Sequence, residues 1–356
     1  MPDAQTRKIY PFLDGLRAVA IIWVLLRHAN DFFKLEGVLG GFYPYFFIVA
    51  RSGYLGVDIF FVLSGFLITG LFLDDLQAHI RIKRFYLRRF FKIIPQYWAV
   101  VLFGGIITTV FYPEDIDAHS VFSNILFIQN YTGLMPILTH TWSIAIEEHF
   151  YLAYPWLLYV ICRLRTTATE RRQLLVQVIW ALGIIVFIAR YFSFSPGRPE
   201  LLSMTHLRVD ALLIGCLLRL CEESISVRWA RKPWRIVLFF AGSALLVSAI
   251  LDTNLYSWWP YTATYLATAC IISAALNGNP VILKLLENNI MRKIGRVSYG
   301  VYLWHLPVIC VLMLIVPNVA AGVTVLLYLF LSLAVGAVSS TTLEKYFLDL
   351  RKRLVP

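Results

Sequence analysis

Hydrophobic positions along the chain fall into long runs instead of alternating with polar positions. A helix needs about 20 mostly apolar residues to cross a lipid hydrocarbon layer, and the runs predict about ten such helices. They lie near residues 12–30, 53–73, 94–112, 143–162, 173–192, 207–221, 235–251, 258–276, 297–316 and 320–341. The pattern predicts an all-α, polytopic membrane protein. Residues 1–356 are expected to form a single membrane-embedded domain with no appended soluble domain.

Composition supports this environment, and the distribution of charge predicts the orientation. Hydrophobic residues make up 59% of the chain and charged residues 15%, and the mean hydropathy is +0.70. Lys and Arg gather at the two ends, with Arg7 and Lys8 at the first, and in the even-numbered connections between predicted helices. Because basic loops stay in the cytoplasm, both termini are predicted to be cytoplasmic. The net charge of +11 then indicates loops beside anionic lipid and no nucleic-acid partner.

Cysteine usage predicts neither a disulfide framework nor a metal site. The five Cys residues have no paired spacing and lie in or beside the apolar runs. They are therefore expected to be free, packed thiols.

The first predicted helix carries two ionisable groups on one face. Arg17 and His28 are eleven residues apart, which returns an α-helix to within about 20° and separates them by about 16 Å along the axis. Asp14 lies near the same face and is expected to pair with Arg17 at the cytoplasmic end. A neutral His28, deeper in the membrane, has the form that a general base requires. The alternative is a histidine that only bonds to a neighbouring helix.

Other predicted helices also carry polar residues. Such residues usually face the interior of a helical bundle or a watery cavity, where they pair with one another or mark a functional path. Ser143 and Glu147 are four residues apart and so share a helix face, whereas Glu148 and His149 point progressively away from it. Hydrogen bonding between helices is the simpler alternative for each. The set comprises Asp58, Ser64, Ser143, Glu147, Glu148, His149, Tyr299, Tyr302 and His305.

A basic stripe precedes the third predicted span. Arg81, Arg84, Arg88 and Lys92 are spaced three, four and four residues apart, with Arg89 beside them, so they line one helix face. Guanidinium groups bind phosphate oxygens in pairs and Lys adds a point charge. The stripe fits a cytoplasmic ligand with several phosphates, such as a coenzyme A thioester. Contact with anionic lipid is the alternative.

Six blocks in one order resemble a known family. They read LDGLRAVAIIWVLLRH, GVDIFFVLSGFLIT, FYLRRFFKIIPQYW, TWSIAIEEHFYLAYPW, RVDALLIGCLL and SYGVYLWHLP. Together they are similar to the acyltransferase 3 family of bacterial membrane O-acyltransferases. The resemblance implies an enzyme of the inner (cytoplasmic) membrane that moves an acyl group, most often acetyl, from cytoplasmic acyl-CoA to a carbohydrate hydroxyl. Typical acceptors are lipopolysaccharide, exopolysaccharide, peptidoglycan and Nod factor sugars, and some relatives acylate macrolides.

The resemblance also implies roles for particular residues. The family has a motif of a basic residue and a His separated by ten residues. In this chain the motif falls on Arg17 and His28, and His28 is expected to be catalytic. The paired-basic motif on the acyl-CoA side falls on Arg89 and Lys92, where the usual second residue is Arg. Lys92 keeps the charge but loses the bidentate fork.

Neighbouring arginines and two further motifs complete these expectations. Arg84 and Arg88 are expected to compensate for Lys92 in binding acyl-CoA. Where the family has Glu-Gln-Phe-Tyr, this chain has Glu148-His149-Phe-Tyr. The His149 side chain is expected to take over the hydrogen bonding of the family's Gln. The family's Arg-x-Asp falls on Arg208 and Asp210, where a sugar acceptor is expected to dock.

The predicted mechanism is base-assisted acyl transfer. His28, oriented by Glu147, Glu148 or Asp58, is expected to deprotonate the acceptor hydroxyl, with Arg17, Ser143 or Tyr302 stabilising the oxyanion. An acyl-enzyme on His28 or a Ser is an alternative, and a transporter or flippase for a lipid-linked sugar or acyl donor is a different class of function. Predicted substrate-binding residues are Asp14, Asp58, Ser143, His149, Arg208, Asp210, Tyr302 and His305.

Overall fold

A computed structural model describes residues 10–73, 80–115, 117–195, 197–228, 232–252, 254, 257–316 and 319–354. Arg7 and Lys8, which contributed to the predicted orientation, lie outside these residues. Within them the chain forms helices and turns and contains no β-strand. This confirms the predicted all-α class.

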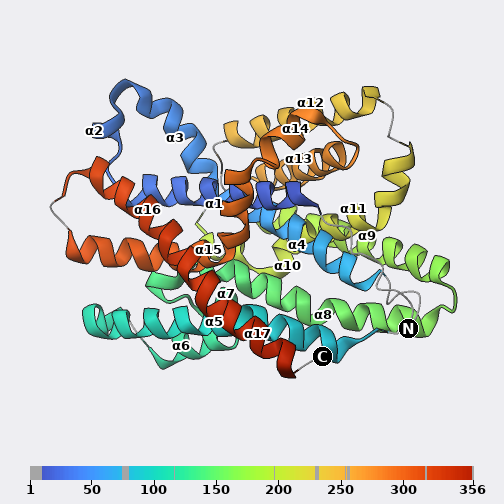
Figure 1. The fold of residues 1–356 in the computed structure, drawn as a ribbon, viewed down its shortest axis with the longest axis horizontal. Helices are drawn as coiled ribbons and strands as arrows, with labels where there is room; N and C mark the ends of the chain where they lie inside the picture. Colours follow the sequence, from blue (N-terminus) through green and yellow to red (C-terminus); the bar gives the residue numbers. More distant parts are fainter. Residues whose placement is uncertain are drawn as a thin grey trace.

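Figure 1 shows the helices in their order along the chain. Their bounds are α1 Pro11–Phe32, α2 Glu36–Leu39, α3 Tyr43–Arg51, α4 Gly56–Phe72, α5 Ile82–Phe111, α6 Ala118–Ile125, α7 Gln129–Thr132, α8 Trp142–Leu164, α9 Ala168–Ser193, α10 Thr205–Arg208, α11 Asp210–Arg228, α12 Lys232–Leu251, α13 Trp259–Leu276, α14 Pro280–Leu286, α15 Asn289–Ile315, α16 Ala321–Ser339 and α17 Lys345–Leu354.

Each predicted span coincides with a long helix in the described part of the chain. Six stretches there are long and apolar enough to cross a membrane, and the pair α13 and α14, bent by 103°, raises the number to seven. Helices α1, α8 and α11 carry more charged and polar residues. The chain is thus a multi-pass, all-helical membrane protein, while ten crossings and cytoplasmic termini stay predictions.

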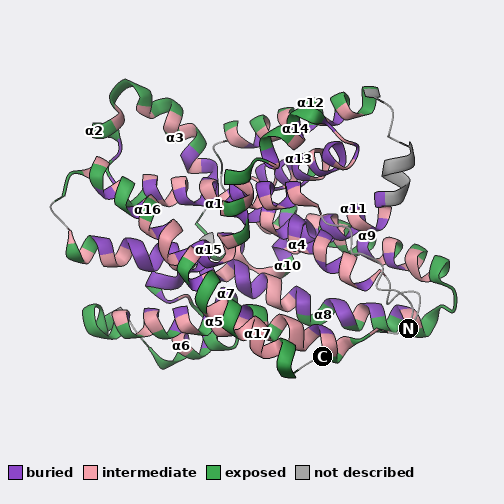
Figure 2. Cartoon of the chain, viewed as in Figure 1, coloured by how far each residue is buried: buried purple, intermediate pink, exposed green. Residues whose placement is uncertain are grey.

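Burial divides the helices into an inner and an outer set (Figure 2). Helix α1 packs on α15, α4 on α11, α15 on α16 and α12 on α13. Only 17% of the apolar stretch of α12 is buried inside the protein, against 61% in α15. Apolar faces left uncovered by protein fit contact with lipid, whereas the inner helices enclose the polar groups.

Several helix beginnings are fixed by local hydrogen bonds. Asn288 accepts from the Met291 N–H at the start of α15, as expected of an N-cap side chain. At the start of α9, Thr167 and Glu170 form a reciprocal capping box. The sequence therefore encodes where these helices begin.

Glycine allows α4 and α11 to approach closely. A Cβ atom on Gly65 would meet the carbonyl oxygen of Leu212, and one on Gly215 would meet that of Val62. Small residues at such contacts permit dense helix packing where no hydrophobic force drives helices together. The two glycines thus set the distance between the helices that carry the buried charges described below.

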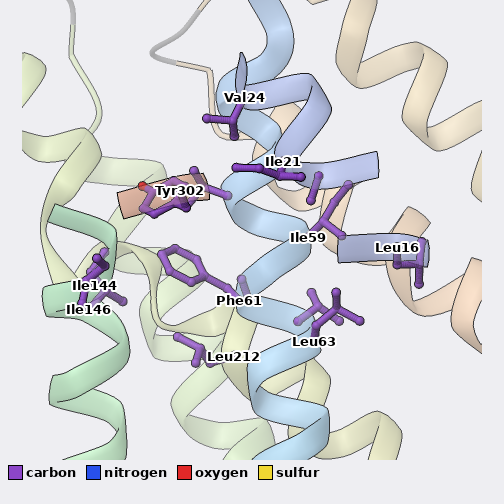
Figure 3. Close-up of a cluster of buried hydrophobic side chains, with 14 of the residues drawn as sticks. Leu16, Ile21, Val24, Ile59, Phe61, Leu63, Ile144, Ile146, Leu212 and Tyr302 are labelled. Atoms are coloured by element: carbon purple, nitrogen blue, oxygen red, sulfur yellow. The ribbon is translucent and has the colours of Figure 1, made fainter. Parts of the chain in front are cut away.

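Apolar side chains of α4 and of the helices beside it meet in the hydrophobic core (Figure 3). Labelled members include Leu16 and Ile21 of α1, Ile59 and Phe61 of α4, Ile144 of α8, Leu212 of α11 and Tyr302 of α15.

Two buried ion pairs join helices at the centre of the bundle. Arg208 lies 2.7 Å from Asp58, with side chains 2% and 0% exposed, and Arg190 lies 2.7 Å from Asp210, with side chains 0% and 6% exposed. The Arg208 guanidinium also stacks 4.2 Å above the Tyr261 ring. Because a charge inside a membrane protein is costly without a partner, these pairs tie α4, α9 and α10 to the start of α11.

Replacing Gly215 by Ala is expected to destabilise the protein, because the added methyl group collides with the backbone of α4. Overpacking of this kind typically costs about 1–3 kcal/mol. Gly183→Ala in α9 is the matched control, since a Cβ atom there meets nothing within 4 Å. Thermal unfolding in detergent measures both variants, and equal unfolding temperatures would contradict the proposed close contact.

Asp58→Asn is expected to destabilise the protein strongly, because it leaves Arg208 buried without its counter-charge. Breaking one side of a buried pair costs about 3–5 kcal/mol. The control is Glu200→Gln, which disrupts the exposed Arg198–Glu200 pair and is expected to leave stability unchanged. Unfolding in a denaturant series measures both, and a native-like Asp58→Asn protein would show that the pair is dispensable.

Candidate active site

A cavity of about 130 Å³ lies among α1, α4, α5, α8 and α15. Charged side chains line it in the N-terminal halves of α1 and α15, where Arg17 and Arg296 are found. Tyr302, two turns further along α15, lines it together with Ser143 at the start of α8. Apolar walls come from Val57, Phe60, Phe61, Ile93 and Ile144. The cavity therefore combines a cationic region with an apolar wall and a pair of hydroxyl groups.

Only part of the basic stripe reaches this cavity. Arg89 and Lys92, three residues apart on α5, both line it, whereas Arg84 and Arg88 are absent from its lining. The Arg89 guanidinium lies 4.3 Å from the centre of the Tyr151 ring, which fixes its direction by a cation–π contact. The two residues matched to the family motif are thus the two that the cavity contains.

The predicted pairing of Asp14 with Arg17 is confirmed. Arg17 lies 3.3 Å from Asp14, and Arg296 of α15 lies 3.4 Å from the other oxygen of the same carboxylate. Asp14 therefore holds two cations at the edge of the cavity. Glu344, in the π-helical turn Ser340–Glu344, lines the cavity as well.

The polar face predicted for α8 also agrees with the structure. Glu147 lines the cavity and accepts hydrogen bonds of 2.8 Å from both Ser64 and Tyr151. Glu148 lies outside the lining, and its buried Oε1 has no hydrogen-bond partner. His149 points to another neighbour, Thr205, whose Oγ1 lies 2.7 Å from Nδ1. These positions follow from the rotation of 100° per residue.

Three histidines cluster beyond the hydroxyl pair. His28 of α1 and His305 of α15 have ring centres 4.8 Å apart, and His140 lies 4.8 Å from His305. His140 and His305 are 4% and 0% exposed, whereas His28 is half-buried. His140 was not among the predicted site residues, because it lies in a connection between predicted spans. Its only signal was its place two residues before the Trp-Ser block that opens α8.

Two of the three carboxylates predicted to orient His28 are bonded to other side chains. Asp58 is bonded to Arg208, and Glu147 is bonded to Ser64 and Tyr151. The His28 ring is held instead by its own helix, with Nδ1 2.9 Å from the Val24 carbonyl oxygen. Buried carboxylates bind the nearest strong donors, and the spacing along one helix does not reveal which donors those are.

Ser143 and Tyr302 join the cavity to the histidine cluster. The Tyr302 hydroxyl lies 2.6 Å from Ser143 Oγ and 2.7 Å from the carbonyl oxygen of His140. Both residues also line the cavity, as does Arg17. All three groups named as oxyanion candidates are therefore present at one cavity, and Tyr302 and Ser143 are the two nearest to the imidazoles.

Arg208 and Asp210 lie outside the cavity lining and are buried in the ion pairs described above. Arg190, the partner of Asp210, was not predicted as a site residue. The role of Arg208 and Asp210 in acceptor binding stays a prediction. Among the described residues no group of three or more His, Cys, Asp or Glu is arranged to hold a metal ion.

Comparisons with known proteins show what the chain is similar to. The chain is 31% identical over 332 residues to the peptidoglycan O-acetyltransferase OatA of Listeria monocytogenes, covering 85% of this chain and 50% of that protein. It is 28% identical over 324 residues to the O-acetyltransferase OatA of Staphylococcus aureus, covering 84% and 50%.

The chain thus spans about half the length of the curated relatives it matches. No solved structure matches it. The family defined by an acyltransferase domain matches residues 10–341, so that nearly all of the cavity and the whole histidine cluster fall inside the match. The chain therefore belongs to the acyltransferase 3 family.

Proposed function

We propose that the protein is a membrane O-acetyltransferase that moves an acetyl group from acyl-CoA to a hydroxyl of a cell-envelope carbohydrate. The observation that carries the proposal is the cavity itself. Arg17, Arg89 and Lys92 line it together with Ser143 and Tyr302, which in turn contact the cluster that contains His28. A phosphate-binding region, a hydroxyl pair and a base are what such a transfer requires.

The donor is expected to bind with its phosphates near Arg89 and Lys92. These cations can bind phosphate oxygens through charge-assisted hydrogen bonds. The cavity volume of about 130 Å³ suits the acyl end of the donor rather than the whole coenzyme, so the nucleotide would stay at the cytoplasmic surface. Arg84 and Arg88, on the same helix but outside the lining, are proposed to contact it there.

The acceptor is proposed to be a carbohydrate of the cell envelope. Relatives named as peptidoglycan O-acetyltransferase and O-acetyltransferase support this class. His28 is half-buried and so is the histidine of the cluster most accessible to a hydroxyl. Ten crossings, cytoplasmic termini and an inner-membrane location complete the proposal, because they put acyl-CoA on the side of the basic loops.

The proposed chemistry is one balanced acyl transfer. His28 accepts the proton of the acceptor hydroxyl while the hydroxyl oxygen attacks the thioester carbonyl. The C–S bond breaks, the acetyl group remains on the sugar oxygen, and the thiolate takes up a proton to leave as coenzyme A. Tyr302, Ser143 or Arg17 donates to the oxyanion, which is commonly a large part of the rate gain.

His28→Ala is expected to reduce transfer by about 10²–10⁴-fold, because it removes the general base. Native and variant proteins in liposomes receive labelled acetyl-CoA and an envelope glycan extract, and both thiol release and label on the glycan are measured. Transfer by the variant at the native rate would refute a catalytic His28. If the native protein consumes no acyl-CoA with several acyl groups and acceptors, transport of a lipid-linked sugar becomes the better hypothesis.

Arg89→Ala is expected to weaken acyl-CoA binding about 10- to 100-fold, since a hydrogen bond between charged groups is worth about 1.5–3 kcal/mol. Lys83→Ala, an exposed cation on the same helix, is the matched control and is expected to bind normally. Lys92→Arg restores a bidentate fork and should bind at least as tightly as the native protein. Titration calorimetry measures the affinity of each variant for acetyl-CoA. Equal affinities of Arg89→Ala and Lys83→Ala would exclude Arg89 from the donor site.

A further inference from the structure

The three clustered imidazoles are each held in one neutral tautomer by a backbone carbonyl. Nδ1 of His28 lies 2.9 Å from the Val24 oxygen, and Nδ1 of His305 lies 2.6 Å from the Tyr302 oxygen. Nε2 of His140 lies 3.2 Å from the Leu303 oxygen. A carbonyl oxygen only accepts hydrogen bonds, so each of these nitrogens carries the hydrogen.

The other nitrogen of each ring is therefore a hydrogen-bond acceptor. These atoms are Nε2 of His28, Nδ1 of His140 and Nε2 of His305. The last two are buried and have no hydrogen-bond partner, which is unfavourable for a polar group that has lost its contact with water. Three acceptors cannot bond to one another, so one additional proton would give the cluster the donor that it lacks.

A proton can supply the missing hydrogen-bond donor better than a larger ligand can. His140 and His305 are fully enclosed, and neither lines the cavity. The charged groups on the α1 side, Arg27 and Asp31, pair with each other at 2.8 Å. On the α15 side the titratable neighbour is Tyr302, whose ring centre lies 5.3 Å from that of His140. The nearest open acceptors for a proton on His28 are thus the other two imidazoles.

We propose that His305 and His140 are positioning residues that share the proton taken up by His28. The proposal rests on the function proposed above. When the acceptor O–H bond breaks, the proton goes to Nε2 of His28 and is then shared with Nε2 of His305 and Nδ1 of His140. When the C–S bond breaks, the cluster gives up the proton again, and the thiolate takes it up and leaves as coenzyme A.

In this arrangement the base and the leaving group act on one proton. The Tyr302 hydroxyl lies between the two regions, because it donates to the backbone carbonyl of His140 at 2.7 Å and lines the cavity with Ser143. No added oxidant, metal or co-reactant is needed. The proton lost by the alcohol is the one gained by the thiol.

The test uses variants that keep the accepting atom but cannot carry a proton. His305→Gln places an amide oxygen near the Nε2 position, and His140→Asn places one near Nδ1. Each is expected to lower kcat about 10²-fold, the lower end of the range for positioned proton transfer, with the KM for acetyl-CoA unchanged. His119→Gln, an exposed histidine of α6, is the matched control. Unfolding temperature and acetyl-CoA affinity verify that each variant is folded.

A second measurement does not depend on turnover. Nitrogen-15 NMR of histidine-labelled protein in liposomes reports the tautomer and protonation of each ring. Hydrogen on Nδ1 of His28 and His305 and on Nε2 of His140, with one added proton shifting all three rings together, is the expected result. Opposite tautomers, or three independent titrations, would overturn the proposal.

The activity results separate the two proposals. Native transfer with native kcat in both His305→Gln and His140→Asn would overturn proton sharing and leave the proposed function intact. Failure of the native protein to transfer any acyl group would overturn the proposed function, and the relay with it.

Discussion

A polar group placed inside hydrocarbon has to find its partner within the protein, and this constraint organises the bundle. Asp58 meets Arg208, Asp210 meets Arg190, and Glu147 meets Ser64. Glycine at the contact of α4 and α11 brings the helices close enough for such partners to meet. The outer helices carry few polar groups and leave their apolar faces to lipid.

Some of the exceptions to this rule lie at or beside the candidate site. His140 Nδ1, His305 Nε2 and Glu148 Oε1 are buried atoms without a hydrogen-bond partner. Unsatisfied groups persist where the surrounding structure holds them in place, and active sites are where that cost is commonly met. The carbonyls of Val24, Tyr302 and Leu303 are what hold the imidazoles, so backbone geometry of α1 and α15 supplies the orientation that a carboxylate supplies in other base-catalysed sites.

The sequence predicted the helices well because each apolar run is read from the chain alone. It also predicted the basic stripe and the pairing of Asp14 with Arg17, since both depend on spacing within one helix, and the catalytic role of His28 stays a prediction. It could not identify His140, which approaches His305 only through the tertiary fold, or Arg190, whose partner Asp210 lies on another helix. The short helices α2, α3 and α6 in the connections were missed for the related reason that their runs are too short to span a membrane.

The most direct test of the proposed donor site is to determine from which side of the membrane the protein uses acetyl-CoA. Protein is reconstituted in a single orientation, and acetyl-CoA is supplied to one face of the liposomes at a time. Thiol release is expected only when acetyl-CoA reaches the face that bears Lys83 and the start of α5. Arg89 and Lys92, which are proposed to bind the donor, line the cavity near that face. Thiol release only from the opposite face would contradict the proposed donor site.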